Sequence, residues 1–161
     1  MKKSAAISDC GAYRYALERL WGDGSRGTCT FIMLNPSTAD ANQYDPTIRR
    51  CLRFADDWGC QGLQVLNLFA LRSTDPKALC SHPDPVGPEN DDYLLAWTQD
   101  SEIVIAAWGV HGALKGRGEA VRRMIPKLHA LKFTKDGHPS HPLYLPKTLT
   151  PIPFPKEPPH A

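Results

Sequence analysis

Two asparagines and two histidines are the side chains of this chain best suited to chemistry. Asn35 stands at the end of one apolar run of strand length, and Asn67 interrupts another. His138 and His141 lie in a proline-rich stretch further along. An amide both donates and accepts hydrogen bonds, and an imidazole changes its protonation near neutral pH. The structural alternatives are an Asn-Pro turn, an asparagine bonded to backbone at a sheet end, and two ordinary loop histidines.

The elements that must position these side chains are visible as apolar patterns. Runs with the length and composition of buried strands cover residues 28–34, 63–69 and 103–108. Apolar residues recur at helical spacing over residues 46–58, 89–98 and 119–128. The first predicted helix has Asp45 as N-cap and Pro46 at its first position, and Gly59 ends it.

Buried strands that alternate with helices predict an α/β fold. We expect three layers, α/β/α, with a mostly parallel central sheet. The carboxyl ends of parallel strands meet at one rim, where ligands collect in such folds. That rim is expected to carry four polar features: Asn35, Asn67, Trp108 with Gly109, and the loop 138–141.

Weaker patterns flank this core. The alternating stretch Tyr13–Leu17 predicts a strand, which we expect to form an N-terminal antiparallel hairpin with residues 28–34. Residues 131–134 predict a last short strand. Prolines crowd residues 147–161, and this tail is expected to be extended or disordered and to carry no core. One α/β domain over residues 1–146 should precede it.

Composition bounds the class of protein. Of the 161 residues 42% are hydrophobic and 22% charged, as in ordinary globular proteins, and no apolar stretch approaches the roughly 20 residues of a membrane span. The five cysteines form no C-x-x-C pair and no secretory signal is evident, so we expect reduced thiols, a cytoplasmic location, and neither metal nor cofactor. A zinc or iron–sulfur site is the alternative.

The net charge of +2 permits a DNA or nucleotide partner. No membrane partner is expected, and a monomer is favoured.

Four blocks of the sequence follow one another as in the uracil-DNA glycosylase superfamily, which the chain resembles. Leu34-Asn35-Pro36 is similar to the first catalytic motif in its Asn-Pro form, and residues 62–68 to the strand whose asparagine reads a pyrimidine edge. Residues 103–109 resemble the strand whose Trp-Gly end precedes a helix. Residues 138–143 resemble the last motif, His-Pro-Ser-Pro-Leu, with an extra His-Pro step.

A second resemblance covers nearly the full length of the chain. Residues 10–15, 34–40 and 141–144 resemble the domain of unknown function 1643. This closer match implies a family and assigns no activity.

The glycosylase resemblance implies a hydrolase that cleaves the N-glycosidic bond of a modified or deaminated pyrimidine in DNA. It implies that Asn67 reads O4 and N3–H of the base and that Asn35 orients a water toward the sugar. His138 or His141 would stabilise the departing base. An asparagine is a poorer base than an aspartate, so slow chemistry is implied.

The resemblance also implies residues that touch the substrate. Leu143 or Tyr144 would fill the space of a flipped base, and Tyr44 or Phe54 would stack on that base. The remaining implied contacts come from Pro36, Ser37, Thr38, Asp40, Trp108 and Gly109.

Two departures from the glycosylase pattern keep other functions open. Ser37 and Thr38 follow the first motif in place of a bulky aromatic residue, so no device excludes a 5-substituted pyrimidine. The basic surface is sparse, and the helical arginines are expected to be solvated, with a phosphate contact as the alternative: Arg49, Arg50 and Arg53. A non-catalytic module that binds a nucleotide or nucleic acid is one alternative function, and a different small-molecule enzyme is another.

Overall fold

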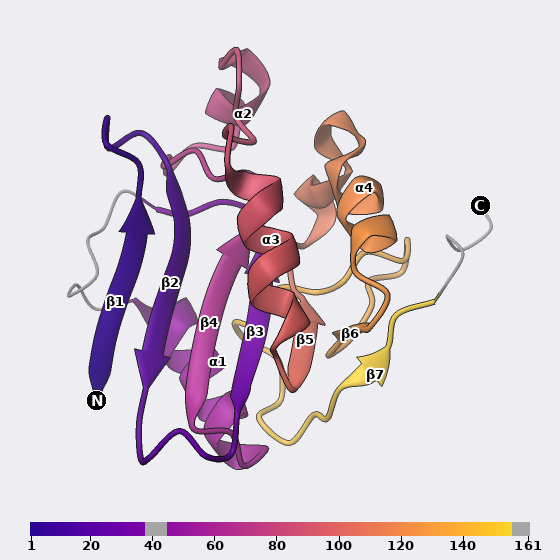
Figure 1. Ribbon diagram of the computed structural model, residues 1–161. Helices are drawn as coiled ribbons and strands as arrows, with labels where there is room; N and C mark the ends of the chain where they lie inside the picture. The colour runs from indigo at the N-terminus through magenta and orange to yellow at the C-terminus, as the bar shows by residue number, and fades with distance from the viewer. Residues whose placement is uncertain (38–44, 156–161) are drawn as a thin grey trace.

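The fold is a mixed α/β sandwich. A computed structural model describes residues 1–37 and 45–155 (Figure 1). Within these ranges seven strands form one sheet in the order β1-β2-β4-β3-β5-β6-β7. The strands are β1 (Lys2–Ile7), β2 (Arg14–Leu20), β3 (Thr28–Met33), β4 (Gly62–Asn67), β5 (Ile103–Ala106), β6 (Leu128–Ala130) and β7 (Ile152–Pro153). The α-helices of the same ranges are α1 (Pro46–Asp57), α2 (Lys77–Ser81), α3 (Asn90–Gln99) and α4 (Arg117–Met124), and a 3-10 helix spans Val110–Gly116.

The sheet is parallel at its centre and antiparallel at both sides. Strands β4, β3, β5 and β6 run parallel, whereas β1 pairs antiparallel with β2, β2 with β4, and β6 with β7. The expected mostly parallel sheet is therefore only partly parallel. The expected hairpin between Tyr13–Leu17 and residues 28–34 is wrong, because β3 has parallel partners on both sides. The hairpin instead joins β2 to β1, which sequence patterns did not indicate.

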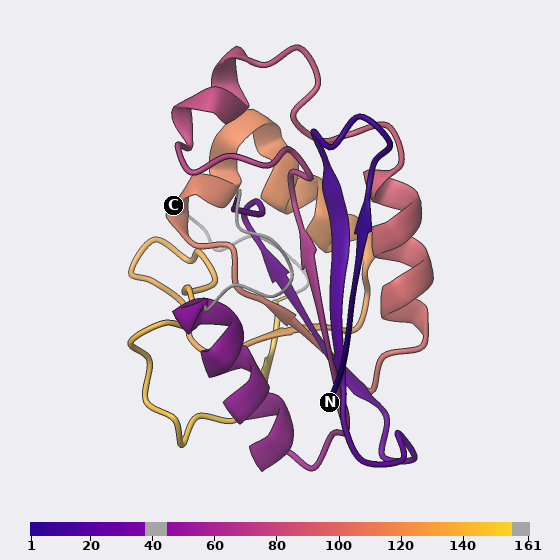
Figure 2. The same cartoon turned by 90° about the vertical axis from the view of Figure 1, so that its left-hand side faces the viewer.

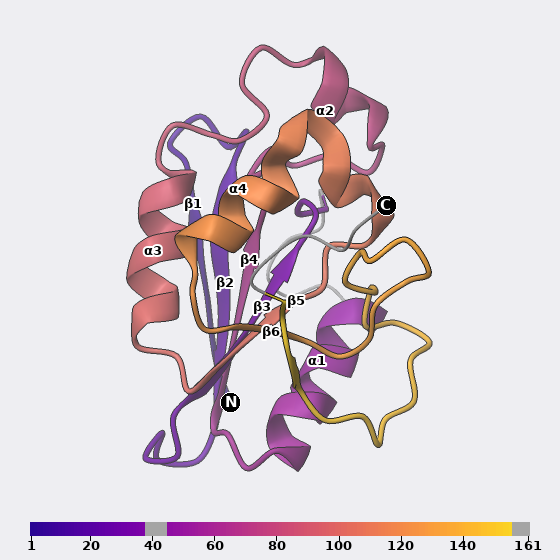
Figure 3. The same ribbon diagram turned by 90° about the vertical axis from the view of Figure 1, so that its right-hand side faces the viewer.

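Helices cover both faces of the sheet, as expected. Helix α1 lies against one face, and α3 and α4 lie against the other, as the two side views show (Figures 2 and 3). We call these the α1 face and the α4 face. Side chains of a strand alternate between them, so Phe31 and Met33 pack toward α1 and Ile32 packs toward α3 and α4. None of the helices in the described part of the chain has the length and apolar character that a bilayer crossing needs.

Helix α1 begins and ends where its sequence predicts. The Asp45 carboxylate accepts hydrogen bonds from the backbone N–H of Thr47 at 2.8 Å and of Ile48 at 3.3 Å. These bonds satisfy two amides that the first helical turn leaves without partners. Gly59 follows the helix with a φ of +84°, a conformation that favours glycine.

The predicted helix over 119–128 is too long, because Pro126 ends the helix before it. Proline disfavours the helical conformation of the residue before it, and Ile125 is extended, with a φ of −122° and a ψ of 93°. Helix α4 therefore ends at Met124, and Leu128 already opens strand β6. The last short strand was predicted three residues too late, over 131–134.

The C-terminal segment 147–155 contributes to the core, contrary to the expected coreless tail. Strand β7 extends the sheet beyond β6, and Phe154 N–H donates to the Leu128 carbonyl at 3.0 Å. The Phe154 ring lies 6.0 Å from the Trp108 ring, centroid to centroid, and packs on the α4 side. Leu149 packs on the α1 side, where its carbonyl accepts a hydrogen bond from Trp58 Nε1 at 3.3 Å.

We predict that Phe154→Ala lowers the free energy of unfolding by about 1–3 kcal/mol, less than truncation of a fully buried phenylalanine costs. The reason is the loss of its contact with the α4-face core. Ile152→Ala is the matched control, because Ile152 is exposed and should change stability by no more than about 0.5 kcal/mol. Urea denaturation measures both. Equal stability of the two variants would contradict the role given to Phe154.

Candidate functional site

Asn35 and Asn67 lie beside each other at the carboxyl ends of β3 and β4. Met33 pairs with Asn67 in the parallel register of the two strands. Leu34 and Leu68 pack into the α4-face core, so the alternation of side chains directs Asn35 and Asn67 to the α1 face. Both asparagines therefore lie at the carboxyl ends of neighbouring strands, on the α1 side of the sheet.

The Asn35 side chain is fixed by the loop that follows β4. Its Nδ2 donates to the carbonyls of Ser73 at 2.9 Å and Pro36 at 3.2 Å, with a longer contact to Leu71 at 3.4 Å. The amide nitrogen is thus engaged by backbone, and Oδ1 is the atom that can accept a hydrogen bond from a water or substrate. Pro36 is buried, and Ser37 is half-buried beside it.

Asn67 is a buried amide at the strand end. Only 3% of it is exposed, and its side chain makes no hydrogen bond to any residue within 1–37 or 45–155. Its backbone carbonyl accepts from Asn90 Nδ2 at 2.9 Å, which holds the strand end in place. An amide can both donate and accept hydrogen bonds, so the Asn67 side chain is suited to contact the polar edge of a ligand.

His141 lies near the start of α1, because its charge interacts with Asp45, the N-cap of that helix. His141 is exposed at the surface, yet the chain around it partly desolvates its imidazole and so lowers its pKa below the ordinary value of 6.5, while Asp45 opposes this shift. Its Nδ1 accepts a hydrogen bond from the Leu143 backbone N–H at 3.2 Å. In a neutral imidazole the proton then resides on Nε2, so His141 is an uncharged hydrogen-bond donor at neutral pH.

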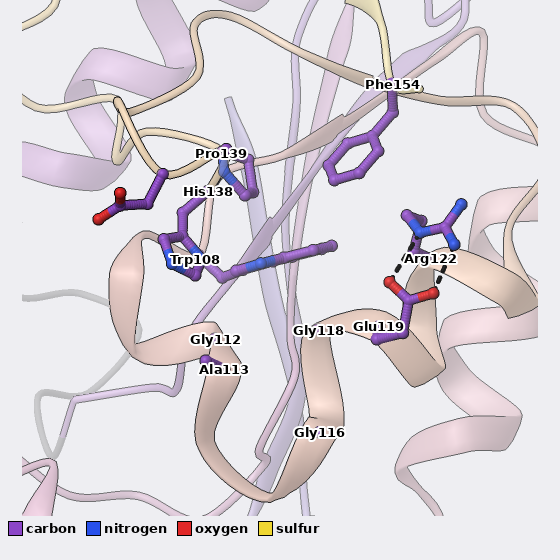
Figure 4. Close-up of a pocket in the computed structure, with 12 residues that line it drawn as sticks. Trp108, Gly112, Ala113, Gly116, Gly118, Glu119, Arg122, His138, Pro139 and Phe154 are labelled. Atoms are coloured by element: carbon purple, nitrogen blue, oxygen red, sulfur yellow. Dashed lines mark hydrogen bonds and ion pairs between the residues drawn. The ribbon is translucent and has the colours of Figure 1, made fainter. Parts of the chain in front are cut away.

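His138 lies elsewhere, in a cavity of about 340 Å³ on the α4 face (Figure 4). Trp108 belongs to the α4-face core and its indole forms one wall. Gly109, with a φ of +73°, donates from its N–H to the Pro139 carbonyl at 2.8 Å and so holds the His138 loop against the strand end. The 3-10 helix approaches closely, since a Cβ at Gly112 would lie 2.0 Å from Trp108 Cδ1.

A charged pair closes this cavity on the side of α4. Arg122 Nε donates to Glu119 Oε2 at 2.9 Å, and hydrogen bonds from Arg122 hold the pKa of Glu119 below its usual value.

Side-chain alternation along β5 divides the expected rim in two. Trp108 and His138 share the α4 face, while Asn35, Asn67 and His141 lie at the α1 face.

Leu143 and Tyr144 lie beside α1, next to three of its arginines. The residues that line this hollow of about 380 Å³ are Pro46, Arg49, Arg50, Arg53, Leu143 and Tyr144. Tyr144 is 91% exposed. Phe54, one of two aromatic residues expected to stack on a base, is buried between Phe31 and Trp58 and cannot do so. The other expected contacts, Thr38, Asp40 and Tyr44, lie outside the described residues.

Sequence reasoning missed Arg14, a charged residue that is only 5% exposed. The β1–β2 register shifts there, with Ala6 opposite Ala16 and Ile7 opposite Arg14, so Tyr15 is the extra residue of a bulge. Bulges re-aim side chains, and Arg14 interacts electrostatically with Asp45. Burial and the nearby Arg72 lower the pKa of Arg14, while Asp45 raises it. The only sequence signal was an arginine between two tyrosines.

Comparisons with known proteins give a family and no activity. A family described as a protein of unknown function, DUF1643, matches residues 14–143. No curated protein and no solved structure matches the chain. Within the part of the chain that the structure describes, no group of three or more His, Cys, Asp or Glu side chains is placed to hold a metal ion.

We predict that His141 titrates below pH 6.5 and is the neutral Nε2–H tautomer at pH 7, which imidazole ¹⁵N NMR measures. Because the folded-state pKa is depressed, the unfolded state binds the proton first as the pH falls below 6.5, so this residue reduces stability in that window and has no effect above it. Asp45→Asn keeps an N-cap side chain and removes the opposing charge, so it should lower the His141 pKa further. A pKa above 6.5 or an Nδ1–H tautomer would contradict this geometry.

Proposed function

We propose, from the residues of this chain alone, that this member of a family of proteins of unknown function, DUF1643, recognises a nucleobase at the α1-face rim. There it would hydrolyse the N-glycosidic bond of a deaminated or modified pyrimidine in DNA. One observation carries the proposal. Asn35 and Asn67 lie at the ends of two adjacent parallel strands on the α1 face, and His141 lies near Asp45, the N-cap of the helix that covers this face.

Asn67 is the base-reading group. A buried amide that faces a ligand can donate to a carbonyl oxygen and accept from a ring N–H, which is the pattern of O4 and N3–H on a uracil-like base. The strand end is fixed through Asn90, so the amide is preorganised for this edge. A cytosine presents an amino group and an unprotonated N3 at the same positions, and it would leave the buried amide mispaired at a cost in binding.

His141 and Asn35 would act on the bond that breaks. When the glycosidic bond cleaves, its electron pair leaves with the base and a water oxygen bonds to the sugar carbon. The proton that this water gives up neutralises the departing base. A neutral Nε2–H of His141 can donate a hydrogen bond to the base oxygen on which negative charge develops. Oδ1 of Asn35 can accept a hydrogen bond from the attacking water, but it is a weak base, so turnover should be slow.

The order of the four sequence motifs supports a uracil-DNA-glycosylase-like arrangement around this partly parallel sheet. In this proposal Leu143 and Tyr144, which lie beside α1, contact the DNA strand that carries the base. We assign the role of the motif histidine to His141 and not to His138, because His138 lies with Trp108 on the α4 face.

A second candidate is a binding module without chemistry. It is favoured by the first motif, which supplies an amide in place of a carboxylate and whose amide nitrogen is engaged by backbone. Such a module would keep the base-reading role of Asn67 and form no product.

A base-release assay tests the proposal. Oligonucleotides that carry uracil, hypoxanthine or a 5-substituted uracil are incubated with the full chain, and free base is quantified. His141→Ala should reduce release roughly 100-fold or more, as loss of one donor to a developing oxyanion does, and Asn35→Ala should reduce it too. His138→Ala should retain most of the release.

The remaining outcomes separate the candidates. Equal losses for His138→Ala and His141→Ala would refute the assignment of the histidine. Oligonucleotide binding without release from any substrate would identify the binding module. Neither binding nor release would refute both functions.

A further inference from the structure

A basic groove runs along the exposed side of α1. Two hollows of about 380 Å³ each follow the helix and share Arg49 and Arg53 as lining residues. The first hollow also has Arg50 and Tyr144, and the second ends at Trp21 near the other end of the helix. Figures 2 and 3 both show α1 alongside the C-terminal loops, with its outer side uncovered by other described elements. We call this feature the α1 groove.

The α1 groove carries more positive than negative charge. Three arginines and one carboxylate, Asp56, are among its described lining residues. Arg53 also forms an exposed ion pair with Asp57, Nε to Oδ2 at 3.5 Å, which solvent screens and which a phosphate can replace. Arg50 is held in place, because its Nη2 donates to the Leu145 carbonyl and its guanidinium lies 5.6 Å from the Phe54 ring centroid. Arg49 and Arg53 are four residues apart on the helix, so their side chains emerge on the same side.

An aromatic ring stands free at the upper end of the groove. Tyr144 has a φ of +72°, in the left-handed region that residues other than glycine rarely adopt. The turn that holds it closes through a hydrogen bond from Leu145 N–H to the Pro142 carbonyl at 3.3 Å. Backbone strain of this kind is found at binding sites more often than elsewhere, and here it presents the ring to solvent beside arginines.

We propose that the α1 groove binds single-stranded DNA, with Tyr144 stacking on a base and the arginines contacting phosphates. This inference rests on the proposed function, because the bound strand would carry the target base to the rim. Positive grooves combined with stacking aromatic rings are how proteins bind single strands without sequence preference. A duplex keeps its bases stacked on one another, so a lone exposed ring has nothing to stack on, and one helical stripe of arginines reaches a single backbone.

Fluorescence anisotropy with a labelled ten-residue thymidine oligonucleotide measures this binding in the full chain. The probe lacks any target base, so binding is measured separately from base release. Three phosphate contacts predict a slope of roughly −2 in log affinity against log salt, hence about 15-fold weaker binding at 200 mM than at 50 mM salt. Tyr144→Ala should weaken binding roughly 5- to 150-fold, whereas Tyr144→Phe should retain it.

Matched arginine variants locate the surface. Arg53→Ser should weaken oligonucleotide binding several-fold and reduce the salt slope, whereas Arg123→Ser should not. Arg123 is a fair control because it is 75% exposed and lies on α4, across the sheet. Circular dichroism of each variant confirms that its fold is retained.

Several outcomes would overturn the proposal. Tighter binding of the matching duplex than of the single strand would refute the preference for single strands. Unchanged binding in Tyr144→Ala, with an unchanged dependence of affinity on salt, would show that the groove binds polyanions without a stacking contact and would refute the proposal. Single-strand binding without base release would leave this inference standing while the hydrolase proposal fails, and base release that is insensitive to Tyr144 and Arg53 would do the reverse.

Discussion

The candidate site depends on one geometric constraint, the two-residue alternation of side chains along paired parallel strands. Met33 pairs with Asn67 across the two strands, and the residues that follow them, Leu34 and Leu68, pack toward α3 and α4. The two asparagines must then face α1, whatever their chemistry. A slip of one residue in either strand would send one amide into an apolar core, where an unpaired polar group costs several kcal/mol relative to water. The hydrophobic core therefore specifies the polar site.

The same constraint explains why the expected rim is divided. Asn35, Asn67 and Trp108 lie at or just beyond strand ends, so their position along β3, β4 and β5 was predictable from apolar runs, whereas loop 138–141 begins eight residues after β6. Their division between two faces was not, because sequence alone does not reveal which face α1 covers. Trp108 has the parity of Val104 and Ala106 along β5, and both of these pack toward α3 and α4. Once the faces are known, that parity separates His138 from His141.

Local signals with a physical mechanism predicted structure well, and features that depend on distant partners were missed. Asp45, Pro46 and Gly59 defined α1 because each acts on the backbone around it. Strand β1 was missed because its residues are mostly exposed and only pairing with β2 makes them a strand. The bulge that aims Arg14 also arises from that pairing. The net charge of +2 is a sum over the whole sequence, so it likewise did not reveal that arginines gather along α1.

The packing of the C-terminal segment bears on when this protein can fold during its synthesis. Leu149 completes the core under α1, and Phe154 completes the core on the opposite face. Both layers therefore lack a part until residues 149–154 have left the ribosome. Earlier lengths of the nascent chain expose unfinished apolar surface on each side of the sheet, which is the kind of surface that chaperones bind.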